Sequence, residues 1–213
     1  MRGITFSVVF GYLVGSLSPA AFLSMLKQKD LKENGTGNLG ATNTMLVFGK
    51  KYGIIVMIFD ILKAFFSVQI AKIMFRNSVI LGLLAGCCAV VGHIFPFYLN
   101  FSGGKGLAAF GGMVLAYDPM LFLVLLFIGI SLMLLTNYGV ALPVSAALLL
   151  PFLAFVRSGN FIDFSLLLVV GCLIIFKHIE NIEKARNGTE IKVREYIKEK
   201  LFAEEKEDHL LQK

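Results

Sequence analysis

The run VILGLLAGCCAVVGHIFPFYL covers residues 79–99 and contains no lysine, arginine, aspartate or glutamate. A helix that crosses the hydrocarbon core of a bilayer needs about 20 consecutive apolar residues. Other long apolar runs lie near residues 4–26, 54–74, 120–135, 140–156 and 161–177. The sequence therefore predicts an all-α integral membrane protein, folded as a compact bundle of transmembrane helices.

The composition agrees with this class and limits the possible partners. The 213-residue chain is 57% hydrophobic and 16% charged, whereas soluble domains carry about 25% charged residues. Its formal charge of +6 comes from basic residues interleaved with acids beside apolar runs, which is typical of a cytoplasmic membrane face and argues against a nucleic-acid partner. We expect residues 1–190 to form the membrane domain and 191–213 a charged amphipathic tail.

The cysteines do not indicate a metal site. Cys87, Cys88 and Cys172 lie inside apolar runs and lack the spacing of metal ligands or of a redox pair. Small, buried cysteines of this kind usually serve as packing residues. The cysteines therefore give no indication of a metal or of a cofactor.

The number of crossings depends on residues 107–118, a short apolar stretch that Asp118-Pro119 closes. Such a segment is either a half-helix or a full crossing. Counting it as a seventh crossing places the N-terminus outside and the C-terminus in the cytoplasm, and basic residues then gather inside, as the positive-inside rule requires. The inside segments hold Lys27, Lys29, Lys32, Lys50, Lys51, Lys105 and the tail from Lys177 onward, whereas the outside segments hold Arg2, Arg76 and Arg157, with Lys72 near that face.

This topology brings three polar segments to the cytoplasmic face. They are NGTGNLGATN at residues 34–43, SGGKG at 102–106 and HIENI at 178–182. In the first segment, glycines allow backbone N–H groups to turn toward an anion, and hydroxyl and amide groups add further donors. The candidate phosphate-binding residues are Gly35, Thr36, Gly37, Asn38, Gly40, Thr42 and Asn43; the alternative is a flexible turn between two helices.

The second segment is also rich in glycine and adds a positive charge. Gly103, Gly104 and Gly106 allow close backbone approach, and Lys105 can meet a phosphate as a point charge at the start of the next helix. The spacing differs from that of a Walker A loop, and no serine or threonine follows the lysine. The alternative is a lysine that contacts lipid headgroups.

Histidines and buried charges complete the set of candidates. His178, beside Glu180 and Asn181, can orient a hydroxyl or accept its proton. Asp60 and Lys63, three residues apart inside an apolar run, share one helical face. They form either an ion pair that fixes helix packing or part of the site, and they are the only support for a small transporter as an alternative function.

These motifs together resemble the bacterial acyl-phosphate:glycerol-3-phosphate acyltransferases, the PlsY family. The resemblance rests on GTGNLGATN at 35–43, GHIFP at 92–96 running into GGKG at 103–106, and HIENI at 178–182. YLVGS at 12–16 and FDILK at 59–63 are similar too, so that residues 5 to 190 are covered in order.

The resemblance implies a seven-helix inner-membrane enzyme of bacteria with its active site on the cytoplasmic face. The enzyme would transfer a fatty acyl group from acyl phosphate to the 1-hydroxyl of glycerol 3-phosphate and so form lysophosphatidic acid for phospholipid synthesis. It would need no coenzyme A, acyl carrier protein or obligatory protein partner. The implied catalytic residues are Lys105 for the phosphate, with His178 and Asn181 at the reacting centre and Glu180 organising them.

The sequence departs from the family pattern at four places, one of them a conservative exchange. Leu46 and Ile179 stand where the family carries arginine, Val140 stands near the place of a serine, and Thr36 takes the place of another serine. Arginine offers phosphate two parallel hydrogen bonds that leucine cannot. An alternative is therefore a divergent paralogue on the same scaffold, with another acceptor or without activity.

Overall fold

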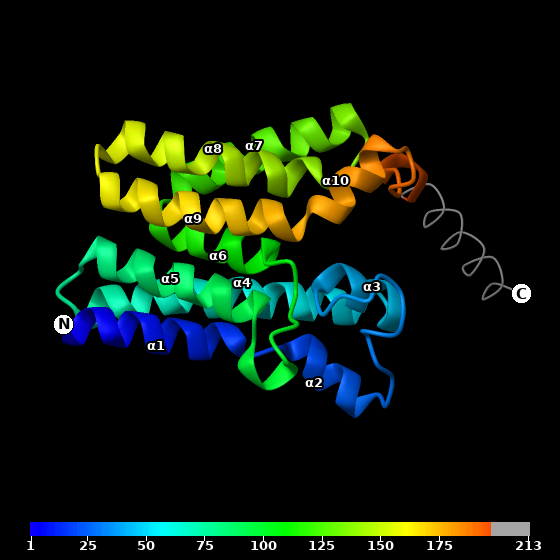
Figure 1. The fold of residues 1–213 in the computed structure, drawn as a ribbon, viewed down its shortest axis with the longest axis horizontal. Coiled ribbons are helices and arrows are strands. Elements are labelled where there is room, and N and C mark those ends of the chain that lie inside the picture. Colours follow the sequence, from blue (N-terminus) through cyan, green and yellow to red (C-terminus); the bar gives the residue numbers. More distant parts are fainter. Residues whose placement is uncertain (197–213) are drawn as a thin grey trace, which may run out of the picture.

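The computed structural model describes residues 1–196, and these residues form helices and no β-strand. Figure 1 shows the helices side by side along one long axis. In chain order they are α1 (Arg2–Ser16), α2 (Pro19–Leu26), α3 (Ala41–Phe48), α4 (Lys50–Met74), α5 (Val79–Ile94), the 3₁₀ helix η1 (Phe97–Leu99), α6 (Leu107–Tyr117), α7 (Pro119–Thr136), α8 (Ala141–Ser158), α9 (Phe161–Lys177) and α10 (Ile179–Arg186).

Every predicted apolar run is helical, which confirms the all-α membrane class. Within residues 1–196, five segments are long and apolar enough to cross a bilayer, and the number is six if α9 and α10, which meet at a 52° bend, are counted as one span. Helix α6 has 11 residues, so it is about 17 Å long and shorter than a hydrocarbon core of about 30 Å. The seventh crossing and the orientation of the bundle therefore stay predictions.

The first predicted span is broken into α1 and α2. Pro19 cannot donate a backbone hydrogen bond and disfavours helical geometry in the residue before it. Ser18 accordingly adopts an extended backbone and caps α2 by accepting a hydrogen bond from the Ala21 amide at 3.2 Å. The break frees the carbonyl of Leu17, and the Lys63 ammonium donates to that carbonyl at 2.7 Å.

The buried charges in α4 therefore have a packing role. The Lys63 Nζ lies 2.6 Å from Asp60 Oδ1, and the Nδ1 of His93 lies 3.2 Å from the same oxygen and 3.0 Å from Nζ. All three side chains are buried. Charges inside a membrane bundle are costly unless paired. The contacts favour the ion pair that fixes helix packing, and they leave the transporter alternative without its support.

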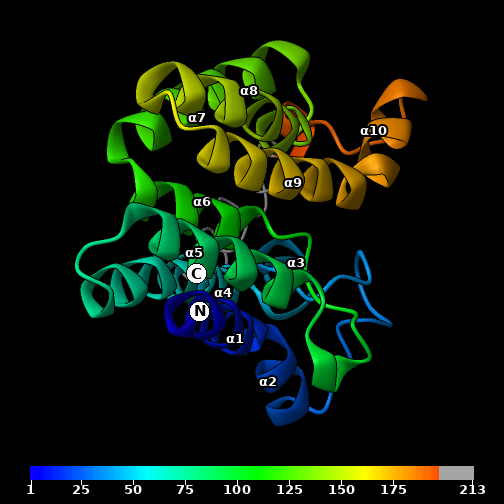
Figure 2. The same cartoon turned by 60° about the vertical axis from the view of Figure 1, so that its left-hand side comes forward.

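Close contacts between helices place α6 at the centre of the bundle. Figure 2 shows α6 between a group formed by α1, α4 and α5 and another formed by α7, α8 and α9. A Cβ atom added at Gly112 of α6 would lie 2.0 Å from the Ile61 carbonyl oxygen of α4. Glycines of this kind let membrane helices approach backbone to backbone.

The start of the predicted tail packs onto the bundle. The amide of Val193 donates to the Asn137 carbonyl at 3.0 Å, and the Arg194 amide donates to the Asn137 side-chain oxygen at 2.9 Å. Residues 191–196 thus lie against the turn between α7 and α8, at the end of the molecule where α3 and α10 also lie (Figure 1). The remainder of the predicted tail, 197–213, lies outside the described residues.

Candidate functional site

A polar hollow of about 300 Å³ opens between the three predicted segments. Each segment contributes to its wall, so the predicted convergence of the three segments is confirmed. The wall is formed by Thr36, Gly37 and Asn38 from the first loop, Ser102, Gly103 and Lys105 from the second, and Phe176, Lys177 and Glu180 from the junction of α9 and α10.

Lys105 is the half-buried cation of this hollow. Its ammonium donates a hydrogen bond to the side-chain oxygen of Asn181. Burial lowers the pKa of Lys105, and the carboxylates of Glu180 and Glu190 oppose that shift because they favour the charged form. The geometry therefore holds one directed positive charge at the edge of a space large enough for a small anion.

Asn181 is itself fixed by a glutamate that the sequence analysis did not single out. The Asn181 Nδ2 group donates to Glu190 Oε1 at 2.8 Å. Glu180, expected to organise the reacting centre, lines the hollow and accepts from Lys184 at 2.6 Å, and this contact is the main cause of its lowered pKa. Glu190 thus orients Asn181, and Asn181 orients Lys105.

His178 is buried at the junction of α9 and α10 and is not part of the wall of the hollow. Its Nδ1 lies 2.8 Å from the Ile174 carbonyl, and since a carbonyl can only accept, Nδ1 carries the proton. Burial is the largest cause of a lowered His178 pKa, and the charge of Lys105 acts in the same direction. The ring is therefore held neutral with Nε2 as an acceptor.

The first loop is shaped by Asn43 rather than completed by it. The Asn43 side-chain oxygen accepts from the Thr36 amide at 2.7 Å, and its Nδ2 donates to the carbonyls of Leu31 and Asn34 at 2.8 and 3.0 Å. Asn43 is fully buried, so its amide is occupied within the protein. The structure makes this predicted phosphate ligand a brace for the loop.

Of the other first-loop residues, two are glycines with a left-handed backbone and two lie at the start of α3. Gly35 and Gly37 have φ of +65° and +70°, a backbone conformation that glycine adopts readily. Gly40 is buried and precedes α3, whose N-terminus has no side-chain cap, while Thr42 is exposed in the first turn and does not line the hollow. Uncapped N–H groups remain at that helix start.

The glycines of the second loop serve packing. The Gly103 amide donates to the Ile94 carbonyl at 3.0 Å, and the Gly104 amide donates to the His93 carbonyl at 3.2 Å. A Cβ at Gly103 would lie 2.1 Å from the His93 carbonyl oxygen. These two amides are therefore occupied by α5, contrary to the expectation that they face an anion. Gly106, at φ +91°, directly precedes α6.

Lys177 is a second cation of the hollow that the sequence analysis treated only as the start of a basic tail. It lines the wall, and its ammonium lies 5.5 Å from the centre of the Phe95 ring. Its position directly before His178 was the available signal. The departures Leu46 and Ile179 are exposed, and Val140 precedes α8; none of the three lines the hollow.

Comparison with known proteins identifies relatives over almost the whole chain. A family described as glycerol-3-phosphate acyltransferase matches residues 5–188. A glycerol-3-phosphate acyltransferase of Aquifex aeolicus is 36% identical over 185 residues, 87% of this chain and 96% of that protein. One of Exiguobacterium sibiricum is 37% identical over 202 residues, 91% of this chain and 95% of that protein.

Solved structures show the same fold. Crystal structures of PlsY, described as an integral membrane glycerol 3-phosphate acyltransferase, have been solved in a glycerol 3-phosphate form and a lysophosphatidic acid form. They superpose on this chain with TM-scores of 0.82 and 0.80, at 33% identity, over 89% of this chain and 94% of theirs.

Proposed function

Since this chain belongs to the glycerol-3-phosphate acyltransferase family, it is an acyltransferase that acts on glycerol 3-phosphate, and we propose that acyl phosphate is its donor. The acyl group passes to the 1-hydroxyl, and the product is lysophosphatidic acid. The observation that carries the proposal is the hollow in which three distant segments meet around Lys105. Both substrates carry phosphate, so a polar hollow with directed cations suits them.

Lys105 and Lys177 are the cations that we assign to the two phosphates. Lys105 is directed by Asn181, and a preorganised charge stabilises the negative charge that develops in the transition state without further reorganisation. Lys177 lines the same hollow and supplies a second positive charge there, whereas Leu46 and Ile179, which stand where the family carries arginine, do not line it. A lysine acts as a point charge rather than as a two-pronged donor.

The chemistry we propose is a direct acyl transfer. The hydroxyl oxygen of the acceptor bonds to the acyl carbon, the bond from that carbon to the phosphate oxygen breaks, and phosphate leaves with the electron pair. We assign the hydroxyl proton to Nε2 of neutral His178, which directly follows Lys177 of the wall of the hollow and whose Nδ1–H donates to the Ile174 carbonyl. The apolar, exposed faces of the helices hold the acyl chain in the bilayer.

We further propose that the protein lies in the bacterial inner membrane with this hollow in the cytoplasm. The basic residues of the loops at that end support this orientation through the positive-inside rule. A cysteine placed at exposed Lys29 should react with a membrane-impermeant thiol reagent only in inverted vesicles. Reaction in intact cells would reverse the proposed orientation.

The decisive experiment uses the purified protein in lipid discs with palmitoyl phosphate and glycerol 3-phosphate. Phosphate and lysophosphatidic acid should appear in equal amounts. Lys105→Ala should lower kcat about a hundredfold to a thousandfold, because one preorganised charge is lost, while Lys29→Ala, an exposed lysine outside the hollow, should not. Phosphate release without lysophosphatidic acid would identify a divergent paralogue with another acceptor.

A further inference from the structure

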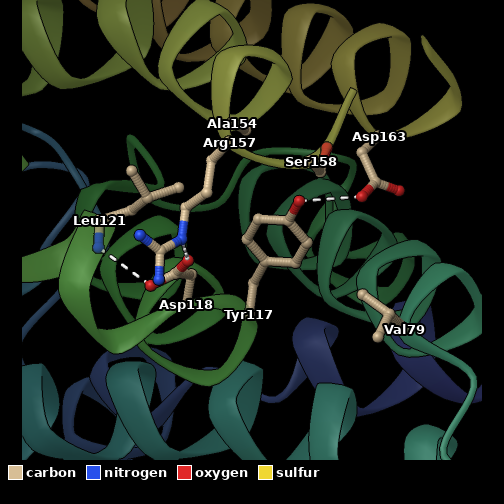
Figure 3. A pocket seen from close by; sticks show the side chains of 8 residues that line it. All are labelled: Val79, Tyr117, Asp118, Leu121, Ala154, Arg157, Ser158 and Asp163. Atoms are coloured by element: carbon tan, nitrogen blue, oxygen red, sulfur yellow. Dashed lines mark hydrogen bonds and ion pairs between the residues drawn. The ribbon is translucent and has the colours of Figure 1, made fainter. Parts of the chain in front are cut away.

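A second pocket lies at the opposite end of the bundle. It contains two carboxylates that differ in how many of their oxygens have a partner. Figure 3 shows this pocket, which measures about 280 Å³ and lies where α6 ends and α9 begins. Its wall is formed by Val79, Tyr117, Asp118, Leu121, Ala154, Arg157, Ser158 and Asp163. The 17 residues of α9 separate it from the hollow around Lys105 by about 25 Å.

The first carboxylate, Asp118, has partners on both oxygens. Oδ1 accepts from the amides of Met120 and Leu121 at 2.9 and 3.1 Å and so caps α7. Oδ2 lies 2.5 Å from Nε of Arg157. The charge of Asp118 is therefore neutralised within the protein.

The second carboxylate, Asp163, is incompletely satisfied. It is 3% exposed, and its Oδ2 accepts a hydrogen bond from the Tyr117 hydroxyl at 2.9 Å. Its Oδ1 is buried and has no hydrogen-bond partner within residues 1–196. Figure 3 shows this second oxygen on the side of the carboxylate that faces away from Tyr117. Buried carboxylate oxygens are normally hydrogen-bonded, and leaving one without a donor is costly.

The charges of the pocket indicate what kind of group would supply the missing donor. Arg157 balances Asp118, which leaves the charge of Asp163 uncompensated among the lining residues. A cation with N–H donors satisfies both the charge and the orphaned oxygen, whereas a quaternary ammonium has no such donor. The Arg157 side chain is 58% exposed, and only its Nε engages Asp118 among the described contacts, so its terminal nitrogens remain donors for an anion.

The position of the pocket indicates which ligand carries both a cation with N–H donors and an anion. The pocket lies at an end of the transmembrane helices, where phospholipid headgroups are found, and its rim includes the apolar side chain of Val79. We propose that this pocket binds the headgroup of a phospholipid with a primary ammonium group. The ammonium donates to Asp163 Oδ1, and the phosphate accepts from the terminal nitrogens of Arg157. This inference does not depend on the proposed acyl donor.

The test compares lipids that differ only in the headgroup. The full-length protein is delipidated in a mild detergent and titrated with dioleoyl phosphatidylethanolamine, phosphatidylcholine or phosphatidylglycerol, and its unfolding midpoint and lipid retention in native mass spectrometry are measured. Phosphatidylethanolamine should raise the midpoint by several degrees more than the other two, as expected for a ligand that binds only the folded state. Equal shifts with the ethanolamine and choline lipids would overturn the proposal.

Variants then locate the effect. Asp163→Asn keeps the shape and an acceptor for Tyr117 but removes the charge, so it should abolish the preference for phosphatidylethanolamine; Arg157→Gln should weaken it. Asp30→Asn, an exposed carboxylate at the other end of the protein, is the matched control and should keep the preference. Headgroup binding at this pocket would be overturned if Asp163→Asn kept the preference for phosphatidylethanolamine. It would also be overturned if free ethanolamine alone gave the full shift of the unfolding midpoint. If Asp163→Asn does not fold, the three-lipid comparison on the unaltered protein decides.

Discussion

The two glycine-rich loops look alike in sequence and are used in opposite ways. In the first loop, Gly37 lines the hollow, and the loop is held from behind by Asn43. In the second loop, Gly103 and Gly104 turn their amides onto α5, and Lys105 supplies the charge that lines the hollow. Glycine is needed in the first case for a left-handed backbone and in the second for close approach between segments. A glycine-rich motif therefore does not by itself identify an anion-binding backbone.

The largest effect is expected for Gly103→Ala, which tests the packing role of the second loop. The added methyl group would meet the His93 carbonyl oxygen at 2.1 Å, and backbone cannot yield as a flexible side chain does. Overpacking and the lost hydrogen bond should reduce the free energy of unfolding by about 3 kcal/mol or more. Thermal unfolding in detergent measures this loss. Gly139→Ala, with no atom within 4 Å of the new Cβ, is the control, and equal stability of the two variants would refute close packing at Gly103.

Asn43→Ala tests the brace of the first loop and should have the second-largest effect. The change leaves the Leu31 and Asn34 carbonyls and the Thr36 amide without their partner, at an expected cost of about 2 kcal/mol. The loop loses its shape, so KM for glycerol 3-phosphate should also rise. Asn38→Ala, which removes a side chain from the wall of the hollow, should raise KM without a comparable loss of stability. A raised KM with unaltered stability in Asn43→Ala would make Asn43 a ligand after all.

Gly37→Ala should have a smaller effect on stability. The nearest atom to the new Cβ is the Lys32 carbonyl oxygen at 3.2 Å, and the penalty comes from φ of +70°, which costs an alanine about 1–2 kcal/mol. Gly37→Asn should lose less, because asparagine tolerates this conformation. Unfolding midpoints of the two variants measure the difference. If alanine and asparagine are equally harmful, space rather than backbone conformation limits this position.

The smallest effect is expected for His178 in the third segment, whose protonation makes the stability of the protein depend on pH. Burial lowers the pKa of His178 from its usual 6.5, so the unfolded chain binds a proton at a higher pH than the folded protein does. The stability that comes from neutral His178 is therefore present above about pH 6.5 and is lost as the pH falls below it. Unfolding midpoints between pH 7.5 and 5.5 should show this decline, and His178→Gln should flatten it. An unchanged decline in the variant would assign it to other groups.

Much of the fold followed from local sequence because its causes are local. Apolar runs long enough to cross a bilayer must be helical, since a membrane offers no other partner for backbone hydrogen bonds. Pro19 nevertheless broke the first run, and Lys63, 46 residues away from Leu17, satisfies the freed carbonyl. That contact could not be predicted from either segment alone. The spacing of Asp60 and Lys63 predicted a shared face, and the structure supplied His93 as the third member.

The candidate site shows the same division between local and distant causes. By itself the sequence determined that glycines, amides, Lys105 and His178 would gather at one end, because alternating crossings carry loops to the same side. Only the tertiary structure decided that Asn43 braces, that Gly103 packs against α5, and that Glu190 orients Asn181. The physical reason is that an amide or a glycine has the same chemistry in every role, and its role depends on which partner the packing of distant helices brings within hydrogen-bond distance.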